Sequence, residues 1–214
     1  MIKTQMTTEL TSASEQTRAR LVDAAREVFS QHGFQGATVR EICRRADANV
    51  AAVNYHFGSK EGLLAEALNF TRLAALQTAN IAAAASPEVR LRMFIRDFML
   101  MLLDEKSASR QCRMMARELA DPTPALDKIV REALAPLHEF LEHLVREIVG
   151  DTVSETELRR CVFSILGQCS FYYHSEPVLQ RLHPELRYDP DEIDAIAAHI
   201  ADFSLAALLA KKNG

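Results

Sequence analysis

The sequence contains no tryptophan, only seven glycines and seven prolines, and four cysteines in 214 residues. Because residues that break helices are few while alanine and leucine are abundant, the composition favours an all-helical protein. The four cysteines are Cys43, Cys112, Cys161 and Cys169, and no two of them form a C-x-x-C pair. This spacing predicts reduced thiols buried in the core of a cytoplasmic protein.

Long apolar runs and targeting signals are also missing. No apolar run approaches the roughly 18 residues that a membrane-spanning helix needs. The N-terminal stretch MIKTQMTTELTSASEQ lacks a basic start followed by an apolar segment, so it does not resemble a signal peptide. We therefore expect a cytoplasmic protein with no membrane partner. The length allows one large domain or two small ones with a buried core.

An excess of basic charge is absent from the chain as a whole, since the net charge is −4. Its distribution is uneven, however. Residues 15–60 carry seven Lys/Arg and five Asp/Glu, whereas residues 61–214 carry 17 and 23. A slightly basic module joined to an acidic body is a weak indication of a DNA-binding head. Random variation would account for these figures equally well.

Signatures of catalysis are missing too. The sequence has no G-x-S-x-G, no P-loop and no dinucleotide-binding fingerprint. The segment HEFLEH resembles a zinc helix but is not H-E-x-x-H, and its His138 and His143 are five residues apart. That spacing places them about 140° apart around a helix, where they do not easily share one metal ion. We expect no enzyme, no cofactor and no metal site.

Helix starts are frequent and clear. Thr38 with Glu41, Ser154 with Glu157, and Asp189 with Glu192 each fit a capping box. SPE at 86–88 and TPA at 123–125 add a proline after a capping residue. Together with the apolar periodicity, these signals predict about nine helices, over 15–32, 38–46, 49–56, 59–84, 87–105, 108–119, 123–149, 154–175 and 190–211.

The first three predicted helices are short and closely connected, and each has one apolar stripe. The stripes are Leu21, Ala25, Val28 and Phe29; Val39, Ile42, Cys43 and Ala46; and Val50, Val53 and Phe57. Gly33 supplies a left-handed turn before the second helix. ADAN at 46–49 joins the second and third helices in a tight turn, as in a helix-turn-helix.

The third predicted helix carries the residues of interest. If Val50 and Val53 face inward, Ala51, Ala52, Asn54 and Tyr55 face largely outward. Two small residues let a helix lie close to a surface, and an asparagine amide can both donate to and accept from base edges. This composition indicates a short reading helix in the major groove of DNA.

Phosphate contacts are expected around that helix. Tyr55 and His56 at its end can donate to phosphate oxygens, and Ser59 with Lys60 places a helix N-terminus beside a cation. Further donors on the second helix are Thr38, Arg40, Arg44 and Arg45. Each residue also has an ordinary interpretation. Tyr55 is then a packed aromatic, His56 caps its own helix, and the two adjacent arginines form a solvated face.

Residues 15–64, EQTRARLVDAAREVFSQHGFQGATVREICRRADANVAAVNYHFGSKEGLL, closely resemble the N-terminal domain of TetR-type transcriptional regulators. The shared pattern is A..VF...GF..ATVR.I...A.......YHF.SKE.LL in continuous register. The resemblance implies a homodimeric, all-helical regulator. Its head binds a palindromic double-stranded operator, and its body binds a small effector that lowers the affinity for DNA.

By position, the resemblance also implies the DNA contacts and two departures. The contacts fall on Thr38, Arg40, Ala51, Ala52, Asn54, Tyr55, His56 and Lys60. Asp47 stands where the family has a turn glycine; aspartate tolerates the left-handed region, so we expect the same turn with some strain. Asn54 stands where the family usually has tyrosine, which leaves the half-site sequence open.

The body resembles the CecR-like branch of the family in RELADPTPALDKIV and GQCSFYYHSEPVLQRL. Members of that branch tend to govern drug export, which the resemblance implies for this chain as well. The predicted helix 154–175 is apolar on nearly all sides, and 190–211 behaves similarly. Two such helices from each of two copies would form a four-helix interface; a core hairpin within a monomer is the alternative. The expected dimer residues are Cys161, Ser164, Gly167, Phe171, Ile196, Ile200, Phe203 and Ala207.

An effector pocket is expected between the helices of the body. Methionine and aromatic side chains line adaptable apolar cavities, although at helical spacing they more often form plain core. The candidate ligand-binding residues are Phe94, Phe98, Met101, Met114, Met115, Arg117, His138, Leu141, Gln168 and Tyr172.

The complete prediction is an all-α regulator. A disordered tail, 1–14, precedes a three-helix DNA-binding domain, 15–60. The helix that follows links it to an effector-binding and dimerisation domain, 61–214. The expected function is that of a homodimeric repressor released from its operator by a small apolar or amphipathic molecule. An effector-independent regulator or activator is the alternative.

Overall fold

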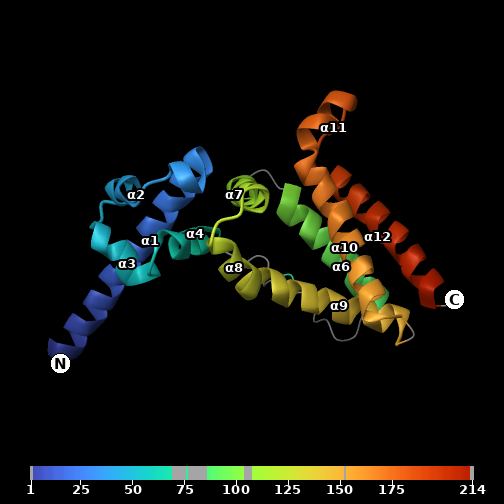
Figure 1. Ribbon diagram of the computed structural model, residues 1–214, viewed down its shortest axis with the longest axis horizontal. Coiled ribbons are helices and arrows are strands. Elements are labelled where there is room, and N and C mark those ends of the chain that lie inside the picture. Colours follow the sequence, from blue (N-terminus) through green and yellow to red (C-terminus); the bar gives the residue numbers. More distant parts are fainter. Residues whose placement is uncertain (1, 69–75, 77–85, 104–107, 152, 213–214) are drawn as a thin grey trace. The chain divides into compact units, whose positions relative to one another are not determined.

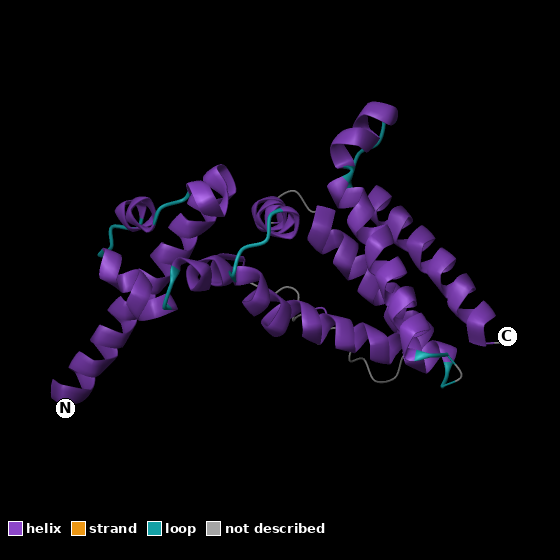
Figure 2. Ribbon diagram, in the orientation of Figure 1, coloured by secondary structure: helices purple, strands orange, loops and turns teal. Residues whose placement is uncertain are grey.

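The structure is a computed structural model that describes residues 2–68, 76, 86–103, 108–151 and 153–212. Every regular element within these ranges is a helix (Figures 1 and 2). The predicted all-α class is therefore confirmed. From residue 69 onward, the predicted linking helix 59–84 lies outside the described residues, apart from Leu76.

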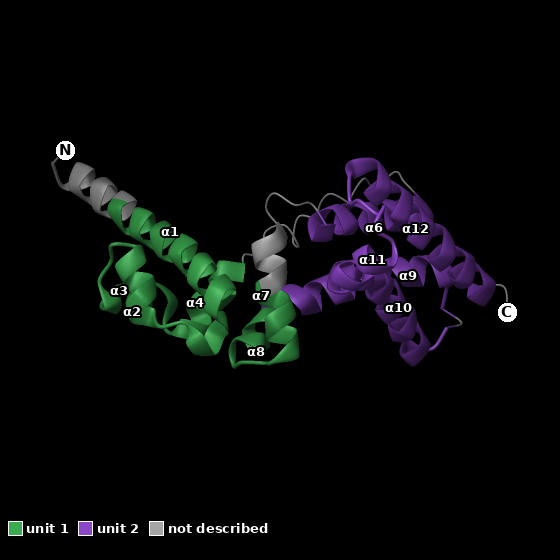
Figure 3. Ribbon diagram, turned by 90° about the horizontal axis from the view of Figure 1, so that it is seen from above, with its two compact units in different colours: residues 1–70, 110–130 green, residues 71–109, 131–214 purple. Residues whose placement is uncertain are grey.

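The chain divides into two compact units, coloured separately in Figure 3. Unit 1 comprises residues 1–70 and 110–130, and unit 2 comprises 71–109 and 131–214. The sequence placed 61–70 and 110–130 in the body, but here they join the N-terminal helices. The reason is packing: α4 (Lys60–Leu68) contacts α1 (Ile2–Gly36) and α3 (Val50–Phe57), and α8 (Ala125–Ile129) contacts α4.

Helix α1 starts much earlier than expected. It begins at Ile2, so the tail predicted to be disordered is helical. Residues 2–14 contain neither proline nor glycine, so nothing in their sequence stops a helix from continuing towards the N-terminus. Near the other end, Gly33 has φ 68° and ψ −179°, which interrupts α1 before its last turn. The positive φ expected at this glycine is confirmed.

The core of unit 1 follows the predicted stripes. Leu21, Ala25, Val28 and Phe29 of α1 are buried, and they meet Ile42 and Cys43 of α2 (Val39–Arg45) and Val53 of α3. Burial of each large apolar side chain contributes about 1.5–3 kcal/mol, which holds these short helices together. Unit 1 also contains most of α7 (Ala108–Ala120).

Unit 2 contains α6 (Pro87–Leu103), α9 (Ala135–Val149), α10 (Glu155–His174), α11 (Glu176–Leu182) and α12 (Pro190–Lys212). Helix α12 packs on α6, α9 and α10. The prediction missed α11, a short helix that starts at Glu176–Pro177 directly after α10. Cys161 and Cys169 are buried as free thiols in α10, and Cys43 is buried in α2.

The predicted helix 123–149 is three consecutive pieces: α8, a π-helical turn at Val130–Leu134, and α9. Pro136 in the first turn of α9 has no N–H, so it cannot donate to the carbonyl four residues earlier. The wider turn accommodates this missing hydrogen bond.

Helix α12 corrects one expectation. By length and composition it is apolar enough to cross a membrane, although the sequence suggested that no segment was. Eight of its residues, including Ile196, Ile200 and Leu205, are buried within unit 2. A core helix of a helical protein passes the same compositional test.

The caps predicted within these three capping boxes are confirmed. Thr38, Ser154 and Asp189 accept hydrogen bonds from the backbone N–H groups of Glu41, Glu157 and Glu192, at 3.2, 3.3 and 2.9 Å. These are local interactions between residues three apart, so the sequence alone specifies them.

Candidate nucleic-acid interface

The turn between α2 and α3 fixes how α3 is presented. Asp47 has φ 47°, so an aspartate adopts the left-handed conformation that we expected at this position. Asn49 caps α3 by accepting a hydrogen bond from Ala51 N–H at 2.9 Å. The sequence prediction missed this cap because it placed Asn49 inside the helix. Together the two residues make a tight helix-turn-helix.

Helix α3 packs through its second turn. The side chain of Val53 is buried at 1% exposure and Phe57 is half-buried. Val50 is 47% exposed, so the prediction that it faces inward was wrong. Val50 is the first residue of α3 and lies before the turn that meets the core.

The outward face of α3 carries the predicted reading residues. Ala51, Asn54 and Tyr55 are exposed, and Tyr55 reaches 80%. Ala52 and His56 are half-buried. The rings of Tyr55 and His56 meet edge to face at 4.8 Å between centroids. This contact holds Tyr55 through its neighbour and leaves its hydroxyl at the surface.

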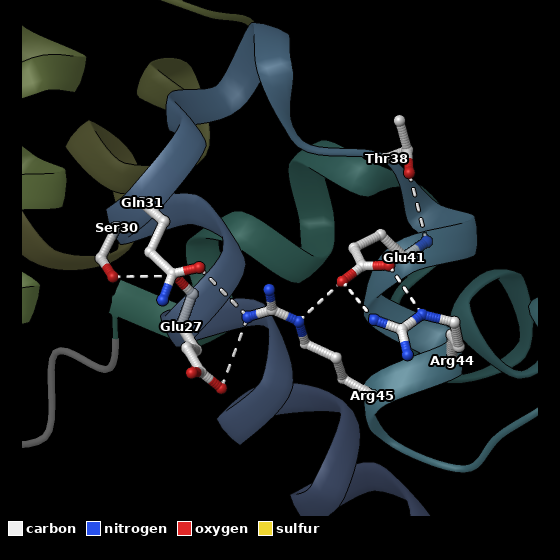
Figure 4. Close-up of polar contacts among 7 residues, drawn as sticks. All are labelled: Glu27, Ser30, Gln31, Thr38, Glu41, Arg44 and Arg45. Atoms are coloured by element: carbon white, nitrogen blue, oxygen red, sulfur yellow. Dashed lines mark hydrogen bonds and ion pairs between the residues drawn. The ribbon is translucent and has the colours of Figure 1, made fainter.

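The arginines of α2 are less available than the sequence suggested (Figure 4). Nε and Nη2 of Arg44 donate to the two carboxylate oxygens of Glu41, at 2.9 and 2.8 Å. Nε of Arg45 donates to Glu41 Oε1 at 2.8 Å. Two cations that we expected to bind phosphate are therefore paired with one carboxylate of their own helix.

Arg45 also extends from α2 to α1. Its Nη1 donates to Gln31 Oε1 at 3.2 Å and lies 3.5 Å from Glu27 Oε2. The side chain is 26% exposed, compared with 71% for Arg44. Arg45 thus joins two helices of unit 1, and its contact with DNA stays a prediction.

The charge of Glu41 is strongly favoured. Hydrogen bonds from Arg44 and then Arg45 lower the pKa of its carboxyl group from 4.5 to about 2. Glu41 is therefore ionised at any pH near neutrality. The residue was recognised in the sequence only as part of a capping box, and its spacing of three and four residues from the arginines is the signal that would have revealed this role.

Lys60 lies over a ring rather than extending into solvent. Its Nζ is 4.2 Å from the centroid of the Phe34 ring, and burial lowers the pKa of the ammonium group. Ser59 accepts from Gly62 N–H at 3.0 Å, which confirms it as the cap of α4. The first turn of α4 also carries the carboxylate of Glu61, whose pKa is lowered by backbone hydrogen bonding and by Ser59. The anion site expected at this helix start is thus already supplied with a negative group.

The close approach of α3 and α4 requires Gly62, which the prediction did not identify. A Cβ at this position would lie 2.1 Å from the carbonyl oxygen of Phe57, the last residue of α3. Only glycine permits this close approach of α3 and α4. The glycine inside KEGLL, within an otherwise helical pattern, was the available signal.

The candidate ligand-binding residues fall in several places. Phe94, Phe98 and Leu141 are buried in the core of unit 2, where the Phe94 and Phe98 rings stack at 5.6 Å. Met101 and His138, also in unit 2, are half-buried, as is Met115 in α7. Gln168 and Tyr172 line an open groove on α10 and α12 with Gly167, Phe171, His199 and Ile200. The pockets of the described residues bring some of these residues together, and a single effector cavity stays a prediction.

Met114 and Arg117 instead line a pocket inside unit 1. It measures about 350 Å³ and is formed by the end of α1, by α4, and by α7 with the loop after it. Buried Phe29 and Leu64 lie on its apolar side. Nη1 of Arg117 donates to the carbonyl of Ser30 at 3.1 Å, so α7 is tied to the last turns of α1 before Gly33.

The predicted dimer residues divide into two groups. Cys161, Ile196 and Ile200 are buried within unit 2, so these three calls are corrected. The others lie on an outer face of α10 and α12 with further small and aromatic residues. This face consists of Phe163, Ser164, Gly167 and Phe171 of α10, and His199, Phe203, Ala206, Ala207 and Ala210 of α12. We call it the α10/α12 face.

A capped helix-turn-helix with an exposed polar second helix defines a DNA-binding protein. Residues 21–67 match the model of the bacterial regulatory proteins of the tetR family, and 87–208 match that of the C-terminal domain of the HTH-type transcriptional dual regulator CecR. The chain therefore belongs to the TetR family of transcriptional regulators and has a CecR-type C-terminal domain.

Individual proteins agree with this assignment. The HTH-type transcriptional dual regulator CecR of Shigella flexneri is 27% identical over 188 residues, covering 80% of this chain and 82% of the relative. A putative transcriptional regulator from Pseudomonas aeruginosa PAO1 superimposes with a TM-score of 0.69 at 21% identity, over 90% and 91% of the two chains. FadR from Bacillus subtilis in complex with stearoyl-CoA gives 0.66 at 16%, over 88% and 97%. The last two similarities concern the fold.

Proposed function

We propose that this regulator binds a palindromic operator as a homodimer and reads each half-site with α3. One observation carries the proposal: Ala51, Asn54 and Tyr55 form an exposed face on a helix whose opposite side, at Val53, is buried. The small residue allows close approach to a groove, and the amide of Asn54 provides a donor and an acceptor for a base edge. Because its partner is chromosomal DNA, the protein acts in the cytoplasm.

The residues around α3 fix its position on the backbone. Thr38, Arg40 and Tyr55 are exposed, and His56 and Lys60 are half-buried beside them. Each has a hydroxyl or N–H group that can donate to phosphate oxygens. Such contacts contribute affinity for any duplex and make it dependent on salt.

A titration with two duplexes tests this assignment. The first duplex is a palindrome that the protein itself selects from random sequences, and the second is a scrambled version. Anisotropy titrations should show that the protein prefers the palindrome by about 10³-fold or more. Tyr55→Phe and Lys60→Ala should weaken both complexes, and Lys60→Ala should reduce the salt slope by about one. Equal affinity for both duplexes would refute sequence-specific binding.

The α10/α12 face supports the homodimer. Phe163, Phe171 and Phe203 are 59%, 54% and 63% exposed in the single chain. Aromatic residues interspersed with glycine, serine and alanine suit close packing against an identical pair of helices. Light scattering should give twice the chain mass at micromolar concentration, and a monomer would contradict the assignment.

We further infer that a small apolar or amphipathic effector binds the pocket of unit 1 and weakens operator binding. The observation that favours this site is the contact of Arg117 with Ser30, because it joins the pocket wall to α1, which leads directly into α2. Stearoyl-CoA bound to the Bacillus subtilis FadR gives a chemical class with which to start. A 100-fold loss of operator affinity requires that the effector favour the weakly binding conformer by about 2.7 kcal/mol.

Filling the pocket tests the effector site. Ala120 lines the pocket, whereas the exposed Leu119 does not. Ala120→Trp should still bind the operator. Acyl-CoA esters and apolar drugs should weaken operator binding by the wild type but not by this variant. Leu119→Trp is the matched control and should respond normally. A normal response of Ala120→Trp would exclude this pocket.

Repression is the regulatory outcome we propose, and drug export genes are the proposed targets, as the CecR-like resemblance implies. The name "dual regulator" of the Shigella flexneri relative favours activation as the second candidate. A reporter under the chain's own operator distinguishes the two. If the protein is a repressor, loss of the regulator should raise expression, and apolar drugs should raise it too. If the protein is an activator, loss of the regulator should lower expression.

A further inference from the structure

We propose that Glu41 limits the affinity of the protein for DNA of any sequence, because its carboxylate holds the guanidinium of Arg44 against the surface of α2. Glu41 is then a positioning residue whose removal tightens binding. The proposal rests on the DNA-binding role of unit 1 but not on any particular operator.

The geometry of the pair is the first argument. Arg44 presents Nε and Nη2 to both oxygens of Glu41, a fork-to-fork arrangement with donor–acceptor distances of 2.9 and 2.8 Å. A phosphate would need those same donors for a bidentate contact. Arg44 can therefore bind phosphate through this fork only after it leaves Glu41.

The position of the pair is the second argument. Arg44 is 71% exposed, and it follows Arg40 by one turn on the same short helix. Among the described residues, Arg40 has no hydrogen-bond or ion-pair partner, so α2 carries one available arginine and two that are paired with Glu41. Glu41 itself is an anion on a surface that we propose faces phosphates, and its charge opposes binding.

The contacts of Arg45 explain why the expected change in DNA affinity comes from Arg44. Gln31 and Glu27 of α1 also contact Arg45, so it stays in place when Glu41 is neutralised. Arg44 has no contact with these α1 residues in Figure 4. Loss of the Glu41 carboxylate thus frees one guanidinium and leaves the joint between α1 and α2 largely intact.

The benefit to a regulator is discrimination. Phosphate contacts add affinity without sequence information, so an additional free arginine strengthens binding to the whole chromosome. A carboxylate that occupies the arginine restrains this non-specific term. Binding at the operator then depends more on the exposed face of α3.

The test uses the full-length protein and a scrambled duplex in a salt titration. Glu41→Gln should tighten binding about threefold to tenfold at low salt and steepen the salt slope by about 0.9, which corresponds to one added phosphate contact. Glu27→Gln is the matched control, because it removes the same charge from α1 and frees no arginine. It should produce less than half of that change.

The contribution of Arg44 is isolated by a double-mutant cycle. Arg44→Gln alone should change the affinity less than twofold, since the arginine is already occupied. In the Arg44→Gln background, Glu41→Gln should tighten binding no more than Glu27→Gln does. Arg44→Gln leaves Glu41 in place, so it tests the proposal even where Glu41→Gln lowers the melting temperature.

Three outcomes would overturn the inference. They are unchanged or weaker binding by folded Glu41→Gln, equal tightening by Glu27→Gln, and a loss of fivefold or more for Arg44→Gln alone. Failure of the wild type to bind either duplex would instead refute the proposed function. The two failures are therefore distinguishable.

Discussion

Two exposed surfaces, one in each unit, differ in chemistry. The outward face of α3 presents an amide, a phenol and small side chains, and its neighbours include arginine, histidine and lysine. The α10/α12 face presents three phenylalanines among glycine, serine and alanine. Polar groups exposed to water keep their hydration until a polar partner replaces it, whereas exposed aromatic rings are stabilised when another apolar surface covers them.

The difference matches the two partners that we propose, DNA and a second copy of the chain. DNA requires hydrogen-bonding groups and positive charge, and a second copy of the chain requires apolar complementarity. Helix α3 is short and buries one turn, while α10 and α12 are long enough to bury one face in their own unit and retain a second face. Substitutions on the two surfaces should therefore separate recognition from assembly.

The largest effect is expected from Gly167→Glu. A Cβ at Gly167 meets no atom within 4 Å, so the single chain accommodates the side chain, but a charge would be buried in the proposed dimer. The variant should be monomeric by light scattering and bind the operator at least 100-fold more weakly. Val89→Glu, an exposed position on α6, is the control and should remain dimeric. A dimeric Gly167→Glu would mean that the α10/α12 face is not the interface.

The next effect separates base reading from backbone binding. Asn54→Ala should lose about 1–3 kcal/mol per half-site on the operator and leave affinity for a scrambled duplex nearly unchanged. Competition binding with operator duplexes changed at single positions will show where the preference is relaxed. An equal loss on both duplexes would make Asn54 a backbone contact and remove the proposed contrast between α3 and its neighbours.

A smaller effect is expected inside unit 1, at the joint between α1 and α2. Arg45→Gln removes contacts with Glu41, Glu27 and Gln31 and should destabilise the protein by about 1 kcal/mol, lowering Tm by about 2–4 °C. Arg44→Gln, which breaks a pair within one helix, should lower Tm by less. The reverse order in differential scanning calorimetry would show that Arg45 does not join the helices.

The smallest effect is expected at the turn that presents α3. Asp47→Gly should raise stability by a few tenths to about 1 kcal/mol, since glycine adopts φ 47° without a Cβ penalty. The salt bridge to Arg20 is long, at 4.0 Å, and both side chains are exposed, so little is lost with it. A lower unfolding midpoint in urea would show that the aspartate stabilises the turn.

Much of this architecture was readable from short-range patterns. Thr38, Ser154 and Asp189 were correctly predicted as caps because a cap and the backbone N–H that donates to it lie three residues apart. The burial of Leu21, Ala25, Val28 and Phe29 followed from helical periodicity. The left-handed conformation of Asp47 followed from the family resemblance, because this position usually holds a turn glycine.

The errors at apolar faces share one cause, because periodicity shows that a helix has an apolar face but not what covers it. Cys161, Ile196 and Ile200 were assigned to a partner and are buried within their own unit, while Phe163 was missed and is exposed. In a helix that is apolar on most sides, the sequence gives two equivalent faces. Val50, at the end of the apolar stripe of α3, was predicted to face inward for the same reason.

The sequence by itself determined most of the helices and their caps, the turn and the chemical character of α3, since these depend on neighbours within about four residues. Only the tertiary structure decided which charges are available and which are paired. Arg45 is held by Glu27 and Gln31, 18 and 14 residues away, and Arg117 by the carbonyl of Ser30, 87 residues away. Electrostatic and hydrogen-bond partners are set by distance in space, and folding brings such distant residues together.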